Sequence, residues 1–204
     1  MSQANASRRV GVMGGAFDPP HLAHRALLQA AQRELQLERV QVIPTGMAWH
    51  KSRILSDASH RFAMAQLAFG DVPGVVLDRR EIERQRPSYT VETLRELHGE
   101  MPDAQLFLII GADQARALTT WHAWAEILQL AIICVADRAC TAEESDVCEA
   151  ENAAPSRFRH LSMPELDISA TDIRNRIAAQ QDVSALVCQG VARYIADHHL
   201  YQIA

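Results

Sequence analysis

Residues 10–24 read VGVMGGAFDPPHLAH, and this stretch decides how the chain can fold. A short apolar run is followed by two glycines and then by residues suited to open a helix, which predicts a β-strand, a tight turn and a helix. Gly14 and Gly15 carry no Cβ, so the backbone there can turn sharply and approach a ligand closely. We expect Asp18 to cap the helix and Pro19 to be its first residue, because both residue types favour those positions.

Two histidines follow this turn at a spacing of three residues. His21 is expected in the first helical turn, with His24 on the same face one turn later. The N–H groups of a helix N-terminus attract anions, and imidazoles aimed at the same point add directional donors. A metal site needs a further ligand nearby, and no such short-range cluster follows in the sequence. The segment therefore predicts a phosphate-binding site, in preference to a metal site or a purely structural turn.

Size and composition fit one soluble domain. The chain has 204 residues, a hydrophobic share of 48% and a net charge of -5, which allow one substantial core and disfavour binding to nucleic acid or a membrane surface. Neither an apolar stretch of membrane-spanning length nor a secretory signal is found in the sequence. No zinc spacing is present among the cysteines, so free thiols in a cytoplasmic protein are expected. The cysteines are Cys134, Cys140, Cys148 and Cys188.

Apolar runs alternate with helical patterns along the chain. Residues 106–110 are continuously apolar, which is typical of a strand buried on both faces of a parallel sheet. We predict an α/β fold, a Rossmann-like doubly wound parallel sheet with helices on both faces, formed by residues 1–204 as a single domain. Residues 1–7 are expected to be a flexible tail, 141–155 a surface loop and 78–86 a solvated charged face. Further strands are expected at 9–13, 40–44, 75–77, 132–135 and 158–162, and helices at 21–37, 56–69, 88–99, 112–118, 121–130, from 169, and at 191–198.

Several predicted strands are followed by segments rich in glycine and polar residues. Ligands of open parallel sheets bind beyond the carboxyl ends of the strands. We therefore expect these segments to converge on one cleft. They are residues 14–24, 44–51, 111–113 and 137–138.

A second stretch suited to phosphate lies nearer the C-terminus, where residues 167–174 read DISATDIR. Ser169 and Asp172, three residues apart, fit a capping box, and a well-capped helix is the simplest interpretation. Ser169, Thr171 and Arg174 also place two hydroxyls and a guanidinium at one helix N-terminus, which can clamp a polyphosphate. Two such helix N-termini in one chain suggest a triphosphate held between them.

Together the two stretches resemble the nucleotidylyltransferase superfamily, which shares a GGxFDPxHxGH-type segment and an ISxTxIR-type segment. Within it, the sequence resembles the bacterial nicotinate-nucleotide adenylyltransferase family. Two positions depart from the family pattern, since Ala16 stands where Thr is usual and Ala23 where Gly is usual. Other segments that carry the likeness are WHK at 49–51, PSYTVETL at 87–94, IGAD at 110–113, TWH at 120–122 and HLY at 199–201.

The resemblance implies an enzyme that joins the AMP moiety of ATP to nicotinate mononucleotide, giving deamido-NAD and pyrophosphate in NAD biosynthesis. The acceptor phosphate is already an anion near neutral pH, so the protein's task is positioning and charge neutralisation. Mg²⁺ is the implied cofactor, held mainly by ATP and water. ATP and nicotinate mononucleotide are the implied partners. No nucleic acid or membrane partner is expected, and a homo-oligomer is left open.

The resemblance also implies the residues of the site. His21, His24 and Arg174 would be catalytic, Asp113 would bond ribose hydroxyls, and Trp121 would stack on the pyridine ring. The residues implied for ATP binding are Gly14, Gly15, Ala16, Phe17, His21, His24, Gly111, Asp113, Ser169, Thr171 and Arg174. The residues implied for acceptor binding are His50, Lys51, Tyr89, Thr90, Trp121 and Arg138.

Several alternatives stay open at the level of sequence. A related nucleotidylyltransferase could use nicotinamide mononucleotide, phosphopantetheine or glycerol phosphate, because backbone N–H groups can bind a carboxylate and the side chains do not decide between acid and amide. Ala16 and Ala23 leave room for a non-catalytic nucleotide-binding relative. Trp121 and Trp124 could both be core residues of a helix. A class I aminoacyl-tRNA synthetase is disfavoured because the chain is too short for an anticodon domain.

Overall fold

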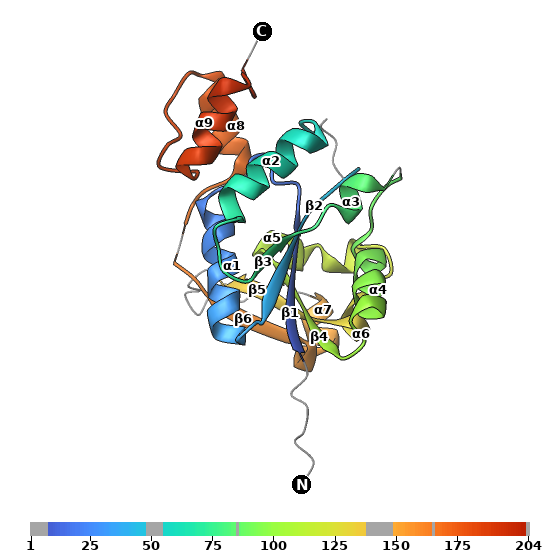
Figure 1. Ribbon diagram of the computed structural model, residues 1–204. Helices are drawn as coiled ribbons and strands as arrows, with labels where there is room; N and C mark the ends of the chain where they lie inside the picture. Colours follow the sequence, from blue (N-terminus) through green and yellow to red (C-terminus); the bar gives the residue numbers. More distant parts are fainter. Residues whose placement is uncertain (1–7, 48–54, 85, 138–148, 165, 203–204) are drawn as a thin grey trace.

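Six parallel strands form the centre of the molecule in the computed structural model, which describes residues 8–47, 55–84, 86–137, 149–164 and 166–202 (Figure 1). The strand order is β3-β2-β1-β4-β5-β6, so the chain builds one half of the sheet outward from β1 and the other half outward from β4. This is the strand order of the Rossmann fold, and the predicted fold class is confirmed. The strands are β1 (Arg8–Gly15), β2 (Arg39–Pro44), β3 (Val75–Leu77), β4 (Ala104–Ile110), β5 (Ala131–Asp137) and β6 (Phe158–Ser162).

Side chains of the strands alternate between two cores, one on each face of the sheet. In β4, Phe107 and Ile109 contribute to one core, whereas Leu106, Leu108 and Ile110 contribute to the other. All of these side chains are at most 2% exposed. This double burial explains why the run is apolar without interruption.

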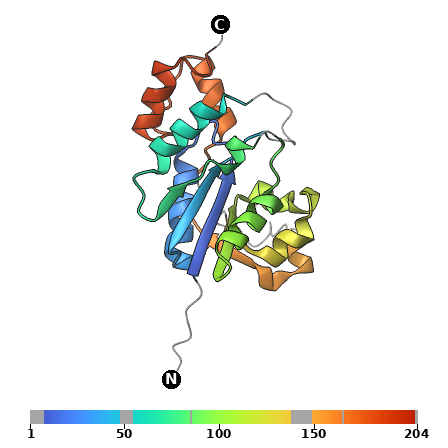
Figure 2. The same ribbon diagram turned by 45° about the vertical axis from the view of Figure 1, so that its right-hand side comes forward.

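Helices cover both faces of the sheet, and the two layers separate clearly in Figure 2. The first core is covered by α1 (Leu22–Leu35), α2 (Ala58–Phe69), α8 (Ala170–Ala178) and α9 (Gln189–Asp197). The second core is covered by α4 (Thr90–Glu100), α5 (Ala112–Arg116), α6 (Trp124–Leu130) and α7 (Glu149–Ala153). Three short helical segments complete the described chain, namely α3 (Arg80–Glu83), η1 (Leu118–Thr120) and η2 (Pro155–Arg157).

The first helix begins later than the sequence predicts. α1 starts at Leu22 with His21 as its N-cap, and Asp18 and Pro19 lie in the turn before it, joined by a cis peptide bond. The expected cap at Asp18 is therefore wrong. Its carboxylate is only 1% exposed and accepts a hydrogen bond from the Tyr201 hydroxyl, a tertiary contact that takes the place of the local cap.

Two other expected segments differ from the structure. The helix predicted at 121–130 starts at Trp124, because Ala123 before it adopts a left-handed backbone with a φ of 51°. Within the predicted surface loop at 141–155, the described part contains α7, and Ala150 on this helix is fully buried in the second core.

Both cysteines among the described residues, Cys134 and Cys188, are free thiols, as expected. The predicted tail at 1–7 and the remaining cysteines, Cys140 and Cys148, lie outside the described residues. None of the described helices combines the length and apolar character needed to cross a membrane.

Candidate active site

Two pockets open at the carboxyl end of β1, one toward each face of the sheet. The α1 pocket lies beside Met13 and Ile109 of the first core, and the α4 pocket lies beside Leu108 and Ile110 of the second. β1 and β4 are the neighbours at which the strand order reverses, and ligands of open α/β sheets bind at such a point. The residues that line both pockets are Gly14, Gly15, Ala16 and Gln114.

The α1 pocket gathers every residue that the sequence resemblance implies for ATP. These residues come from the end of β1, where Gly14 and Gly15 still belong to the strand and do not form the predicted tight turn, from the turn that follows, and from the starts of α1, α5 and α8. Of the segments predicted to converge on one cleft, 14–24 and 111–113 both reach this pocket, whereas Thr45 of segment 44–51 lines the α4 pocket. The residues are Gly14, Gly15, Ala16, Phe17, His21, His24, Gly111, Asp113, Ser169, Thr171 and Arg174.

The two histidines stack at the entrance of α1, with ring centroids 3.7 Å apart. The backbone N–H of His21 donates to Nδ1 of His24 at 3.2 Å. A nitrogen that accepts this bond carries no proton, so the geometry assigns the neutral His24 proton to Nε2.

His21 is the more deeply buried of the pair, at 8% exposed. Its Nδ1 has no hydrogen-bond partner within the described parts of the chain. Burial lowers the pKa of His21 to about 4, because a charged imidazole loses its hydration there. A bound anion would favour the charged form, so this ring is set to respond to a phosphate ligand.

The N-terminus of α8 meets the turn before α1. Ser169 caps the helix as predicted, since its Oγ accepts the N–H of Asp172 at 3.0 Å. Arg174 donates through Nη2 to Oγ1 of Thr171 at 3.0 Å and through Nη1 to the backbone oxygen of Asp18 at 2.8 Å. The Arg174 guanidinium therefore joins the two segments predicted to bind phosphate, residues 14–24 and 167–174, which are far apart in the sequence.

A buried arginine that the sequence analysis missed supports the floor between the pockets. Arg61 of α2 is 2% exposed. Its Nη1 donates to the backbone oxygens of Ala16 at 3.0 Å and Thr45 at 2.6 Å, and its Nε donates to the oxygen of Ser56 at 2.9 Å. The turn after β1 is thus tied to the segments that follow β2 and precede α2. An isolated arginine in an amphipathic helix gives no sequence signal of this role.

Gln114 is a second residue that the sequence analysis missed. Its Oε1 accepts the backbone N–H of Gly111, the N-cap of α5, at 3.2 Å, and its side chain lines both pockets. Asp113, which was predicted, is next to it and is exposed, with its carboxylate bonded to Arg116. The signal available in the sequence was the place of Gln114 in the first turn after a buried strand.

The α4 pocket contains those residues predicted for acceptor binding that the structure describes. Tyr89, Thr90 and Trp121 all line it. Trp121 is half-buried and also packs against the second core, so the functional and core interpretations of this residue are compatible. The ring of Tyr89 lies 4.7 Å from that of His122, a pocket residue that the sequence analysis left out. The other predicted residues, His50, Lys51 and Arg138, lie outside the described residues.

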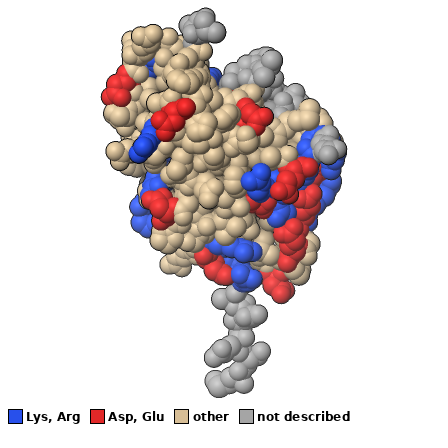
Figure 3. All heavy atoms as spheres, turned by 45° about the horizontal axis from the view of Figure 1, so that its top comes forward, with Lys and Arg blue, Asp and Glu red and all other residues tan. Residues whose placement is uncertain are grey.

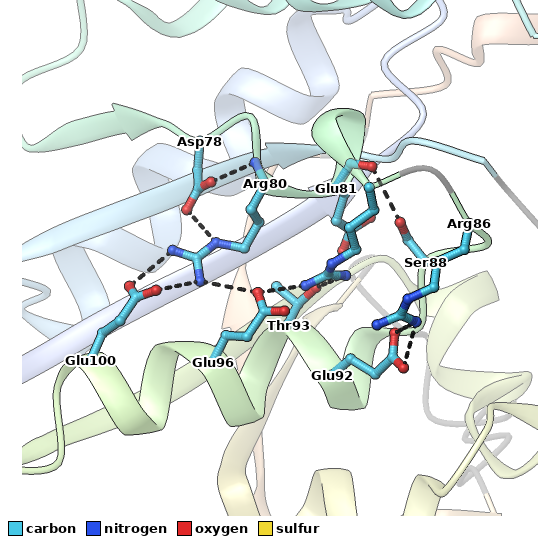
Figure 4. Close-up of polar contacts among 10 residues, drawn as sticks. Asp78, Arg80, Glu81, Arg86, Ser88, Glu92, Thr93, Glu96 and Glu100 are labelled. Carbon is cyan, nitrogen blue, oxygen red and sulfur yellow. Dashed lines mark hydrogen bonds and ion pairs between the residues drawn. The ribbon is translucent and has the colours of Figure 1, made fainter.

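Glu81 also lines the α4 pocket, and its burial contradicts the expectation that residues 78–86 form a solvated face. The side chain is 7% exposed, and its Oε1 accepts a bond from Oγ1 of Thr93 at 2.8 Å (Figure 4). Burial raises the pKa of Glu81 above its usual range. Thr93 in turn accepts a bond from Nη1 of Arg84 at 3.0 Å, so a buried polar chain lies behind the pocket.

Three arginines around Glu81 form ion pairs with α4, and these pairs hold the segment against that helix. α4 presents three glutamates at four-residue spacing on one face, so arginines from the preceding segment can each reach one. Figure 3 shows these acidic and basic side chains gathered on one flank of the molecule, over α3 and α4. The pairs are Arg86 with Glu92 at 2.7 Å, Arg84 with Glu96 at 2.6 Å and Arg80 with Glu100 at 3.0 Å.

Known proteins are similar to this chain in sequence and in fold. A protein of Albidiferax ferrireducens named "Probable nicotinate-nucleotide adenylyltransferase" is 60% identical over 97% of this chain and 100% of its own length. A protein of Methylibium petroleiphilum with the same name is 42% identical over 97% of this chain and 94% of its own length. The solved structure of Plasmodium falciparum nicotinic acid mononucleotide adenylyltransferase complexed with NaAD matches the fold, with a TM-score of 0.76, 16% identity and coverage of 95% of this chain and 97% of that chain.

A Rossmann-like sheet with two phosphate-suited helix N-termini facing one pocket defines the nucleotidylyltransferase class. Residues 12–176 match the family model described as cytidylyltransferase-like, which agrees with this class. Within the class, the chain belongs to the nicotinate-nucleotide adenylyltransferase family, because a relative is 60% identical over nearly its whole length. The family resemblance found in the sequence is confirmed.

Proposed function

We propose that the protein transfers the AMP moiety of ATP to nicotinate mononucleotide, giving deamido-NAD and pyrophosphate in NAD biosynthesis. One observation carries the proposal. The pocket that contains the whole implied ATP set and the pocket that contains Tyr89, Thr90 and Trp121 share a floor at Gly14 and Gly15. A donor nucleotide in the α1 pocket and an acceptor in the α4 pocket would bring their reacting phosphates together above this floor.

The α1 pocket supplies what a triphosphate requires. The Ser169 and Thr171 hydroxyls and the Arg174 guanidinium would bind the outer phosphates, at a helix N-terminus that favours anions. His21 and His24 would donate to the phosphates as negative charge develops toward the leaving pyrophosphate. Asp113 would accept hydrogen bonds from ribose hydroxyls, with Gly111 in the same turn after β4.

The reaction needs alignment more than acid–base chemistry. An oxygen of the acceptor's 5′-phosphate would form a bond to the α-phosphorus of ATP, while the bond from that phosphorus to the bridging oxygen of pyrophosphate breaks. The attacking oxygen is already anionic, so no group has to remove a proton from it. The protein would hold two anions in line and neutralise the charge that spreads onto the departing phosphates.

Mg²⁺ would accompany ATP in the proposed reaction. The donors of the α1 pocket are hydroxyl, imidazole and guanidinium groups, which suit phosphate oxygens and leave other phosphate oxygens to coordinate the ion together with water. Within the described parts of the chain, no group of three His, Cys, Asp or Glu side chains could hold a metal ion. Bound to the triphosphate, Mg²⁺ would supply additional neutralisation of charge.

The acceptor would be recognised in the α4 pocket. Trp121 would stack on the pyridine ring, while Tyr89 and Thr90 stand at the start of α4. The N–H groups of a helix N-terminus favour a carboxylate over a neutral amide, which supports nicotinate as the acceptor. His50, Lys51 and Arg138 remain proposed contacts for the acceptor's phosphate.

Pyrophosphate release tests this proposal directly. The protein is given Mg-ATP with nicotinate mononucleotide, nicotinamide mononucleotide or phosphopantetheine in separate reactions. We expect release with nicotinate mononucleotide and a much lower rate with its amide. Faster turnover of the amide would contradict the nicotinate assignment, and no release with any acceptor would contradict the enzymatic function.

A further inference from the structure

Tyr201 reaches from the far end of the described chain to the turn before α1. Its hydroxyl donates to Oδ1 of Asp18 at 2.6 Å. The other carboxylate oxygen of Asp18 accepts the backbone N–H of Ser56, which precedes α2, at 3.3 Å. The side chain of Asp18 is 1% exposed, so this is a buried, charge-assisted contact between residues 183 positions apart. Neither Tyr201 nor Asp18 has a role in the proposed chemistry.

Asp18 is placed to transmit this contact to the α1 pocket. It lines the pocket and stands three residues before His21. Its backbone oxygen accepts the Nη1 bond of Arg174 at 2.8 Å, so the same residue orients the guanidinium expected to bind phosphate. A shift of Asp18 would therefore disturb both sides of the pocket at once.

We propose that Tyr201 is a positioning residue for nucleotide binding, whose hydroxyl fixes Asp18 and thereby the turn before His21 and the orientation of Arg174. The inference rests on the proposed function, since it assigns Tyr201 to the ATP side of that site. It predicts that the hydroxyl acts on ATP and leaves acceptor binding in the α4 pocket unaffected.

The chemistry of the contact supports this role. Burial, followed by the hydrogen bond to Asp18, raises the pKa of Tyr201, so the phenol stays protonated and acts as the donor. The ring packs against the first core, so a phenylalanine would keep this packing and lose the hydroxyl contacts with Asp18 and with Sδ of Met64. Without that donor, the buried carboxylate of Asp18 loses a charge-assisted hydrogen bond that helps to hold it in place.

The first test compares Tyr201→Phe with Tyr194→Phe. Tyr194 makes a matched control because its hydroxyl also bonds a partner, Nδ1 of His60 at 3.0 Å, but on the α2–α9 contact away from Asp18. In Tyr201→Phe we expect kcat/KM for ATP to fall about tenfold to a hundredfold, in line with loss of a hydrogen bond to a charged group. The KM for nicotinate mononucleotide should stay within about twofold, because Tyr201 does not line the α4 pocket. Tyr194→Phe should match the wild type, because Tyr194 lines neither pocket and its hydroxyl bonds His60.

A double-mutant cycle separates positioning from general stability. In an Asp18→Asn background, the further change Tyr201→Phe should lower kcat/KM for ATP by less than about threefold, because the two residues act as one unit. Asp18→Asn alone should lower kcat/KM for ATP about as much as Tyr201→Phe does. If Tyr201→Phe does not fold, Asp18→Asn takes its place as the test of the contact. Additive losses, or equal changes in the KM of both substrates, would overturn the inference.

Failure of the proposed function would be recognised separately. If the wild type releases no pyrophosphate, calorimetric binding of an ATP analogue to wild type, Tyr201→Phe and Tyr194→Phe still tests the positioning role. Weaker binding in Tyr201→Phe alone supports it. Equal affinity in all three proteins, or equal kinetics in an active enzyme, contradicts it.

Discussion

At the scale of single residues, His21 shows how burial sets up a ligand response. The ring is held neutral inside the pocket that is proposed to receive a triphosphate, because burial lowers its pKa from 6.5 to about 4. Protonation of this ring therefore costs free energy in the folded protein unless a bound anion is present. This predicts both a pH dependence of stability and a role in catalysis.

The stability of the ligand-free protein should fall as the pH is lowered from about 6.5 to 4. Over this range the unfolded state takes up the His21 proton and the folded state does not, so the contribution of this group to the free energy of unfolding drops by roughly 3 kcal/mol. Urea unfolding at a series of pH values measures it. His21→Gln should flatten this part of the profile, whereas His98→Gln, at an exposed position, should leave it unchanged.

His21→Ala should lower kcat far more than it raises the KM for nicotinate mononucleotide. The ring is expected to act on charge that develops in the transition state, in the pocket opposite the acceptor. Steady-state kinetics with both substrates varied separates the two constants. An unchanged kcat would refute the phosphate role of this histidine.

Glu81 predicts the opposite pH dependence. Its pKa is raised by burial, so the folded protein holds this proton more tightly than the unfolded chain does, and stability is lost as the pH rises through the folded-state value. Glu81→Gln keeps an oxygen for the Thr93 hydroxyl and has no charge to bury. We expect the variant to gain stability relative to wild type at pH 8 and not at pH 4, measured by urea unfolding. An equal difference at both pH values would contradict the assignment.

At the scale of elements, ion pairs between residues 80–86 and α4 support the shape of the α4 pocket. The backbone N–H of Ser88 donates to the oxygen of Met47 at 3.2 Å, and the arginines before it pair with the glutamates of α4. Tyr89 and Thr90 lie at the junction of these contacts. The geometry of the α4 pocket therefore depends on ion pairs that do not themselves line it.

Arg84→Gln should raise the KM for nicotinate mononucleotide several-fold, with little change in the KM for ATP. The Arg84 side chain is 9% exposed and bonds both Thr93 and Glu96, so its loss releases the support behind Glu81. Arg8→Gln is the control, because its pair with Glu38 is half-exposed and neither residue lines a pocket. Equal effects on both substrates would argue for general destabilisation.

Local pattern explains which elements could be predicted. The apolar run of β4 and the Ser169 cap of α8 were read correctly, because each depends on neighbouring residues. The start of α1 was predicted wrongly, because Asp18 does not cap the helix and instead accepts a hydrogen bond from Tyr201, which lies far away in the sequence. The burial of Glu81 was missed for the same reason, because its segment looks solvated until α4 packs against it.

At the scale of the whole molecule, the candidate ATP site joins segments from both ends of the described chain. We expect ATP to stabilise the protein by about 2.7 kcal/mol at a hundred times its dissociation constant, because it binds the folded state alone. Thermal unfolding with and without Mg-ATP measures this. Arg174→Gln should remove most of the shift, since this residue bridges the α8 N-terminus and the turn after β1.

The bond from Arg174 to the backbone of Asp18 also has a consequence for how the protein is made. On the ribosome, the turn after β1 (Arg8–Gly15) emerges well before α8 (Ala170–Ala178). A nascent chain that has completed most of its sheet still lacks one wall of the nucleotide pocket. We therefore expect the α1 pocket to become able to bind a nucleotide only after α8 has been made.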